Sequence, residues 1–163
     1  MVKIDNLIQI GRVSRINELE LSRYLNFFGN SYKNNMEHCK AVMKAFPRWS
    51  IISGYYAMHD ITKLLLAKQY RLKVEFKVHE TTIKLLRELI KNKELTRLAE
   101  KGYKEFLTLA NDLAEAKKDR VKVQYYTGTE YMKQQYKKRA QEFLEETVEP
   151  YLHKMQKLTG EKG

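Results

Sequence analysis

Residues 51–66 read IISGYYAMHDITKLLL, and their apolar side chains cover more than half the circumference of a helix. A helix that is apolar on nearly every face is buried inside a protein. Gly54 lies within this segment, and a glycine in a helix interior costs about 1 kcal/mol relative to alanine. A neighbouring helix that approaches closely at Gly54 would offset that cost. We therefore expect residues 51–66 to form the central helix of a bundle.

Four further segments carry apolar residues at the spacings of three and four that predict amphipathic helices. The first, about residues 15–46, is one helix, or two with a break near Gly29. Ser14 is its expected N-cap. Pro47 ends it, and Ser50 is the expected N-cap of the central helix. The four segments span about residues 15–46, 78–91, 94–126 and 127–158.

The later segments contain signals for helix breaks and starts. Gly102 is a candidate break within residues 94–126, and Pro150 is expected to kink or end the last helix. Thr127 and Glu130 have the spacing of a capping box, which predicts the start of that helix. Residues 68–77 are basic and show no clear period, so we expect them to be a connection.

The composition favours long helices joined by few turns. The chain has 163 residues with only 7 Gly and 2 Pro, which fits one domain and is not typical of a many-stranded β fold. We predict an all-α fold, an antiparallel up-and-down bundle of four to five helices within residues 14–158. Residues 1–13 are expected to be an extended or irregular arm, and residues 159–163 a frayed tail.

The formal net charge of +11 favours polyanionic partners such as nucleic acids, although a basic surface can also serve solubility alone. Cys39 is the only cysteine, so we expect a small buried side chain in a reducing compartment. The chain shows neither the apolar core of a signal peptide nor an uncharged stretch of membrane-spanning length. These features predict a cytoplasmic protein that does not enter membranes.

The histidines give no metal-ligand spacing, and no glycine-rich phosphate loop is present. We expect no metal and no cofactor. The four histidines are His38, His59, His79 and His153.

Three short elements occur in a characteristic order along the chain. They are Tyr55-Tyr56-Ala57-Met58, Lys77-Val78-His79 and the segment 120–125, which reads RVKVQY. In these elements the chain resembles the HEPN family of small helical domains, over about residues 17–158. The resemblance implies a HEPN-like bundle that forms a homodimer with its arginine motifs facing each other. It also implies a domain that acts on RNA or pairs with a nucleotidyltransferase.

The chain departs from the ribonucleases of this family at the third element. Those enzymes carry an arginine followed four to six residues later by a histidine. Here Arg120 is followed by Gln124 and Tyr125, and the next histidine is His153. We therefore favour an accessory domain that binds RNA or nucleotide and partners a small nucleotidyltransferase in a toxin–antitoxin type pair. The alternatives are a metal-independent endoribonuclease and a structural helical interaction protein.

Three residues are candidates for the chemistry of such a site. Arg120 is a candidate phosphate clamp, because a guanidinium matches phosphate oxygens and stays protonated. Tyr125 can donate a hydrogen bond or stack on a base, but its reference pKa of about 10 makes it a poor base. His79 is the candidate remote base. In the structural alternative, Arg120 forms an internal salt bridge.

Lysines interleaved with tyrosines are typical of surfaces that follow a phosphate backbone, and equally of any solvated basic helix face. The lysines that we expect to contact nucleic acid are Lys77, Lys117, Lys118, Lys122, Lys133 and Lys137.

Overall fold

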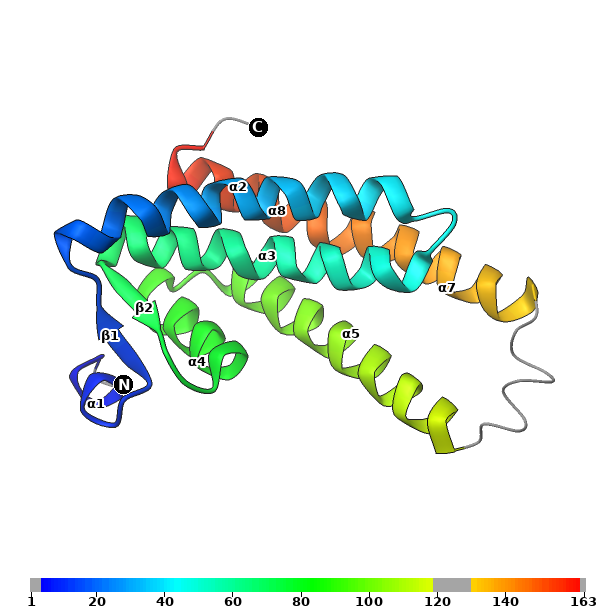
Figure 1. Cartoon of the computed structure of the whole chain (residues 1–163), viewed down its shortest axis with the longest axis horizontal. Helices are drawn as coiled ribbons and strands as arrows, with labels where there is room; N and C mark the ends of the chain where they lie inside the picture. The colour runs from blue at the N-terminus through cyan, green and yellow to red at the C-terminus, as the bar shows by residue number, and fades with distance from the viewer. Residues whose placement is uncertain (1–3, 119–129, 162–163) are drawn as a thin grey trace.

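A computed structural model describes residues 4–118 and 130–161, with the backbone alone for residues 112–118 and 130–133. It shows the predicted all-α helical bundle (Figure 1). The longer helices are α2 (Glu18–Val42), α3 (Pro47–Tyr70), α5 (Lys93–Lys118) and α7 (Glu130–Phe143). The shorter elements are α1 (Ile4–Gln9), β1 (Val13–Arg15), β2 (Leu72–Val74), α4 (Val78–Leu85), the π-helical turns η1 (Leu86–Ile90) and η2 (Leu144–Val148), and α8 (Glu149–Thr159).

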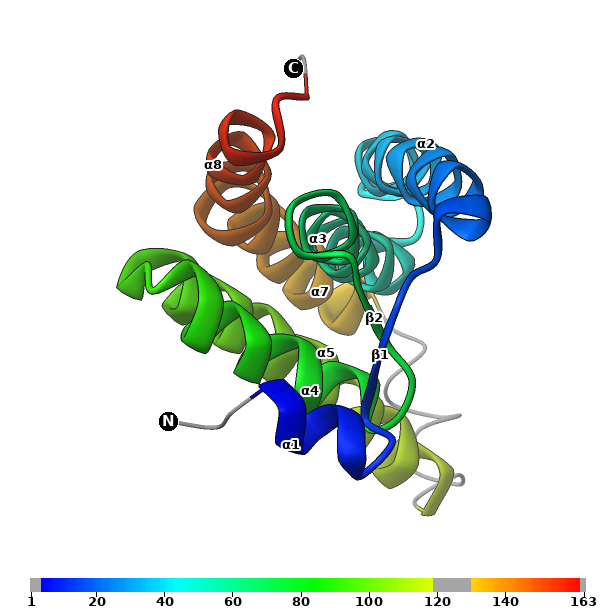
Figure 2. The same ribbon diagram turned by 90° about the vertical axis from the view of Figure 1, so that its left-hand side faces the viewer.

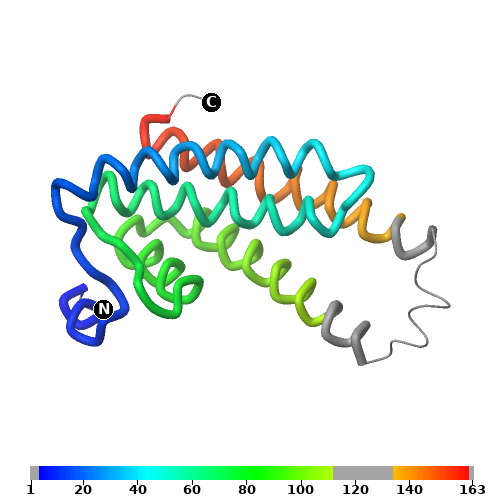
Figure 3. The backbone as a smooth tube through the Cα atoms, viewed as in Figure 1, coloured from blue at the N-terminus to red at the C-terminus, as the bar shows by residue number. Residues whose placement is uncertain are grey.

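Helix α3 is the central helix, as the apolar run predicts. Figure 2 shows α3 end-on, with α2 on one side, α8 and α7 on another, and α4 and α5 below. Its side chains from Ile51 to Ala67 are buried on nearly every face. The tube in Figure 3 shows that α2 and α3 run antiparallel and are joined by one tight connection. The main core therefore surrounds α3.

Gly54 lies where two other segments, α2 and η2, approach α3 closely. A Cβ atom at this position would lie 3.0 Å from Val148 Cγ2 and 3.2 Å from Cys39 Sγ. The close approach that the sequence predicts is confirmed. Cys39 is buried as expected.

We expect Gly54→Ala to lower the free energy of unfolding by about 1–3 kcal/mol, because the added methyl group overpacks this contact. Gly29→Ala is the matched control, since its Cβ meets nothing within 4 Å. That change should be stabilising by up to about 1 kcal/mol, the helix propensity difference. Urea unfolding of both variants measures the contrast, and equal stabilisation of the two would contradict the packing.

The ends of the first two long helices differ from the predicted caps. Asn17 is the N-cap of α2, and its side chain accepts a hydrogen bond from the Glu20 amide at 2.8 Å. Ser14 instead belongs to β1 and donates to Glu75 at 2.6 Å. Helix α3 begins at Pro47, and Ser50 donates to the Cys39 carbonyl at 2.7 Å rather than capping. Helix α2 is continuous through Gly29.

The expectation of an extended or irregular arm over residues 1–13 is wrong for residues 4–9, which form α1. Strands β1 and β2 pair antiparallel, with Val13 opposite Val74 and Arg15 opposite Leu72. The apolar side chains of this region form a second small core beside α3 and α4. The helix α1 turns Leu7 toward this core. That core contains Leu7, Val13, Leu66, Leu72, Val74 and Leu85.

Neither Gly102 nor Pro150 breaks its helix. Helix α5 continues through Gly102, where a Cβ atom would lie 2.9 Å from Met58 Cε, so the glycine makes room for Met58. The π-helical turn η2 ends at Val148, two residues before Pro150, and this wider turn accommodates a ring that would clash in a regular helix. The expected frayed tail is wrong at its start, because α8 reaches Thr159 and the Glu161 amide bonds to the Gln156 carbonyl. The Thr127 capping-box position lies outside the described residues.

Candidate functional site

Six rings from three helices meet beside the main core. We call them the aromatic–histidine cluster: Tyr55, Tyr56 and His59 on α3, His79 on α4, and Tyr103 and Phe106 on α5. The centroids of the His59 and His79 rings are 4.8 Å apart. His79 stacks on Tyr103 at 5.3 Å, and Tyr55 stacks on Phe106 at 4.8 Å. The spacing of four residues between Tyr55 and His59 places both rings on one face of α3.

Tyr55 and His79 form a hydrogen bond between the phenol oxygen and Nδ1. Burial raises the pKa of Tyr55 well above its ordinary value. Burial, followed by the charge of Lys63, lowers the pKa of His79. Both groups are therefore uncharged near neutral pH. We assign the phenol as the donor to Nδ1, because a phenol O–H is a stronger donor than a neutral imidazole N–H and an imidazole nitrogen is the stronger acceptor. The proton of His79 consequently resides on Nε2, where it is a hydrogen-bond donor.

His59 is the more buried of the two histidines, with 6% of its surface exposed. Burial lowers its pKa from 6.5 to about 3, and the charges of Lys63 and His79 act in the same direction. His59 is therefore a neutral imidazole at physiological pH. Its position supports the ring of His79 and leaves no cation inside the cluster.

Lys63 supplies the positive charge next to the cluster. Its ammonium lies 5.0 Å from the centroid of Phe28, and burial lowers its pKa. Asp60 is bound by other groups, because its carboxylate accepts from Ser31 Oγ at 2.6 Å and from Asn35 Nδ2 at 2.9 Å. Among the described residues, no carboxylate lies within ion-pair distance of Lys63. The charge of Asp60 acts on Lys63 and raises its pKa against the effect of burial, but no ion pair holds the ammonium in place.

We expect Lys63→Gln to raise the pKa values of both His59 and His79. The ammonium of Lys63 opposes protonation of each imidazole, so its removal makes the charged forms less unfavourable. NMR titration of the imidazole Cε1 protons measures both values. Lys33→Gln is the matched control, since Lys33 pairs with Glu161 and acts on neither histidine. Unchanged titration curves in Lys63→Gln would contradict this electrostatic arrangement.

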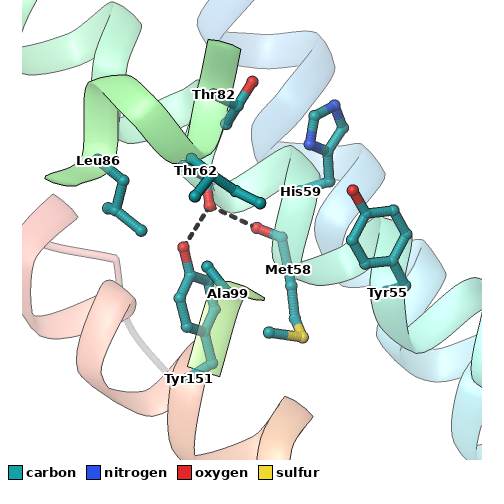
Figure 4. Close-up of a pocket in the computed structure, with 9 residues that line it drawn as sticks. Tyr55, Met58, His59, Thr62, Thr82, Leu86, Ala99 and Tyr151 are labelled. Carbon is teal, nitrogen blue, oxygen red and sulfur yellow. Dashed lines mark hydrogen bonds between the residues drawn. The ribbon is translucent and has the colours of Figure 1, made fainter. Parts of the chain in front are cut away.

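A small cavity lies behind the cluster, lined by residues of α3, α4, η1, α5 and α8 (Figure 4). The Thr62 hydroxyl donates to the Met58 carbonyl at 2.7 Å and accepts from Tyr151 at 2.6 Å, as the dashed lines show. The cavity has a volume of about 20 Å³, which is room for one water molecule. A ligand would therefore contact the cluster from its half-exposed outer side, at Tyr56, His79, Tyr103 and Phe106.

The structure brings together two of the three elements that resemble the HEPN family. Tyr55 of the first element bonds to His79 of the second. The predicted role of His79 as a remote base stays a prediction. Lys77 is exposed and is the N-cap of α4, with a left-handed φ of 46°. Lys137 lies on α7, and Figure 1 separates α7 from α4 along the long axis.

The third element is not part of the described chain. Arg120, Lys122 and Tyr125 lie outside the described residues. For Lys117 and Lys118 on α5 and Lys133 on α7, only the backbone is described. The predicted roles of these six residues stay predictions.

Sequence reasoning missed His59, Lys63, Tyr103 and Phe106. The spacing of four residues that joins Tyr55, His59 and Lys63 was the available signal, because it places them along one face of a helix. The residues from α5 gave no such signal, since their periodicity is that of an ordinary buried face. Their place in the site follows from the packing of α5 on α3.

Comparison of the chain with protein-family models, curated proteins and solved structures finds no match. Within the described ranges, no three His, Cys, Asp or Glu side chains gather as ligands for a metal ion. None of the described helices has the length and apolar character needed to cross a membrane.

Proposed function

We propose that the chain is a HEPN-like accessory domain that binds RNA or nucleotide and works as a homodimer beside a small nucleotidyltransferase, in a toxin–antitoxin type pair. The observation that carries the binding role is the aromatic–histidine cluster next to Lys63, on a chain with a formal net charge of +11. The family resemblance supports the partner and the dimer.

The cluster offers the groups that an unpaired nucleotide needs. Tyr56, Tyr103 and Phe106 are half-exposed rings on which a base can stack. The Nε2–H of His79 can donate to a phosphate oxygen, and the ammonium of Lys63 provides the nearby charge. Together these groups recognise a flat ring and an anion, which are the two parts common to every nucleotide.

The same geometry favours binding over catalysis. Metal-independent cleavage of RNA needs a general base near neutral pH. The lone pair of His79 at Nδ1 already accepts the Tyr55 proton, and the pKa of His59, about 3, makes it a weak base. An endoribonuclease with Arg120 as phosphate clamp is the second candidate, carried by the resemblance of residues 120–125 to the third family element.

The deciding experiment incubates the purified protein with labelled tRNA and mRNA in EDTA and follows both retention and cleavage. We expect salt-sensitive retention without cleavage. His79→Gln should weaken retention about twofold to tenfold, the effect of one lost hydrogen bond. His153→Gln is the matched control, because His153 is exposed on α8 and outside the cluster. Arg120→Ala tests the third element in the same assay.

Each outcome separates the candidates. Cleavage in EDTA that disappears in Arg120→Ala would make the protein an endoribonuclease and overturn the accessory role. Retention that is equal in His79→Gln and His153→Gln would remove the cluster from the binding site. An Arg120→Ala variant that loses stability and keeps full retention would support the structural role of Arg120.

A further inference from the structure

An open groove lies between α2 and α3 near the connection that joins them. Its volume is about 640 Å³, which is within the usual range for small-molecule sites. Asn35 and His38 line it from α2, and Trp49, Ser53 and Tyr56 line it from α3. Phe46 lines it from the connection. The spacings of three and four residues on each helix place these side chains on the two facing sides.

The groove combines exposed aromatic faces with a few polar atoms. Trp49 is 60% exposed and Phe46 is 61% exposed, which is unusual for rings of this size in a protein surface. His38 Nδ1 and Ser53 Oγ, 2.5 Å apart, join the two helices. Asn35 donates to Asp60 through Nδ2, which leaves its amide oxygen to accept a hydrogen bond from a ligand.

The charges of the α2–α3 connection, at the end of the groove where Phe46 lies, fit an anionic ligand. Residues 40–49 contain Lys40, Lys44 and Arg48 and no acidic residue. Lys40 lies 4.0 Å from Glu149, and the Arg48 guanidinium lies over the ring of Tyr136, whereas Lys44 has no ion-pair partner among the described residues. No carboxylate is among the described side chains that line the groove. An acidic segment would use only the cations, and a purely apolar segment would use only the rings. A nucleotide uses both.

We infer that this groove is a nucleobase subsite, in which an unpaired base of a single-stranded RNA stacks on Trp49. The base edge faces Asn35 and the His38–Ser53 pair, and the phosphates lie toward Lys44. The inference rests on the proposed function and extends it, because it specifies single-stranded RNA as the ligand and adds a second contact site.

Tyr56 makes the groove continuous with the aromatic–histidine cluster. It lines the groove, and its ring also meets the rings of His79 at 6.4 Å and Phe106 at 5.7 Å. Trp49 and Lys63 are separated by fourteen residues along α3, or about 21 Å at 1.5 Å per residue. A short single strand can therefore follow α3 from the groove to the cluster, with bases stacked at both ends.

Trp49 is the only tryptophan in the chain, so its fluorescence reports on this groove alone when the indole is excited selectively. The experiment titrates the full chain with a short single-stranded RNA and with an abasic strand of equal length and charge. Fluorescence anisotropy of a label on each strand measures binding in parallel. We expect both strands to bind, and only the strand with bases to quench Trp49.

Two variants assign the effect to the groove. Trp49→Ala should weaken binding of the RNA about tenfold, and leave the abasic strand within about twofold, because one stacked base contributes about 1–3 kcal/mol. Phe27→Ala is the matched control, since Phe27 is 63% exposed on α2 and does not line the groove. Trp49→Phe should retain most of the affinity, which distinguishes loss of stacking from loss of folding.

The outcomes separate this inference from the function on which it rests. Binding of RNA without quenching, and with equal affinity in Trp49→Ala, would overturn the subsite and leave the RNA-binding role intact. Absence of binding by either strand would overturn both. Equal quenching by the two strands would show that a phosphate backbone, and not a base, occupies the groove, and would also overturn the subsite.

Discussion

Lowering the pH from 7 to 4 is expected to destabilise the protein by about 3 kcal/mol through His59 alone. The pKa of His59 is about 3 in the folded protein and 6.5 in the unfolded chain. Between these two values the unfolded chain binds a proton that the folded protein does not. Stability is therefore full above pH 6.5 and is lost as the pH falls toward the folded pKa. Because His59 is only 6% exposed, solvent screens this effect little.

Urea unfolding at a series of pH values measures this dependence, with His59→Gln as the comparison. The variant has its own stability at neutral pH, so the quantity to compare is the change between pH 7 and pH 4. We expect the wild-type change to exceed that of His59→Gln by about 3 kcal/mol. His79 has a lowered pKa and remains in both proteins, so only the part of its effect that depends on His59 enters the difference. Parallel pH profiles would show that His59 is protonated without cost in the fold.

Replacement of Tyr55 by alanine is expected to lower the free energy of unfolding by about 3–5 kcal/mol. Tyr55 is buried and stacks on His59, Tyr103 and Phe106, so truncation leaves a cavity at the junction of α3 and α5. Tyr55→Phe keeps the ring and removes only the bond to His79. That variant should lose about 1 kcal/mol.

The same two variants test the orientation of His79. The Tyr55 hydroxyl donates to the neutral imidazole, so its removal in Tyr55→Phe should raise the pKa of His79. NMR titration in wild type and Tyr55→Phe gives that shift, and denaturant unfolding gives the stabilities. If Tyr55→Phe lowered the pKa of His79, the hydrogen bond would run in the opposite direction.

The central helix and the all-α class were predictable because residues 51–66 are apolar on nearly every face, and only the centre of a bundle buries such a helix. The close approach at Gly54 followed from the same reasoning. The pairing of β1 with β2 was not predictable, since each strand has three residues and their partners are far apart in sequence. Serine is a common N-cap residue, but Ser14 pairs with Lys73 in the strand instead of capping α2.

The site was only partly predictable for a related reason. Resemblance directed attention to Tyr55 and His79 as separate elements, and no local pattern indicates that the two side chains touch. Their contact depends on how α4 packs on α3. The roles of Tyr103 and Phe106 depend in the same way on α5. Arg120 was the strongest sequence candidate, and its role awaits the retention assay.

The pairing of β1 with β2 also bears on the order in which the chain folds. The pair Arg15–Leu72 closes a loop that contains residues 16–71, which is the whole of the α2–α3 hairpin. Closing a loop of that length costs chain entropy, and this cost comes before the three residue pairs of the ladder can form their hydrogen bonds. Formation of the helical hairpin shortens the distance between the two strands, so the ladder closes after the hairpin. We therefore expect α1 to dock after the ladder forms, and residues 4–15 to open before the helical bundle does.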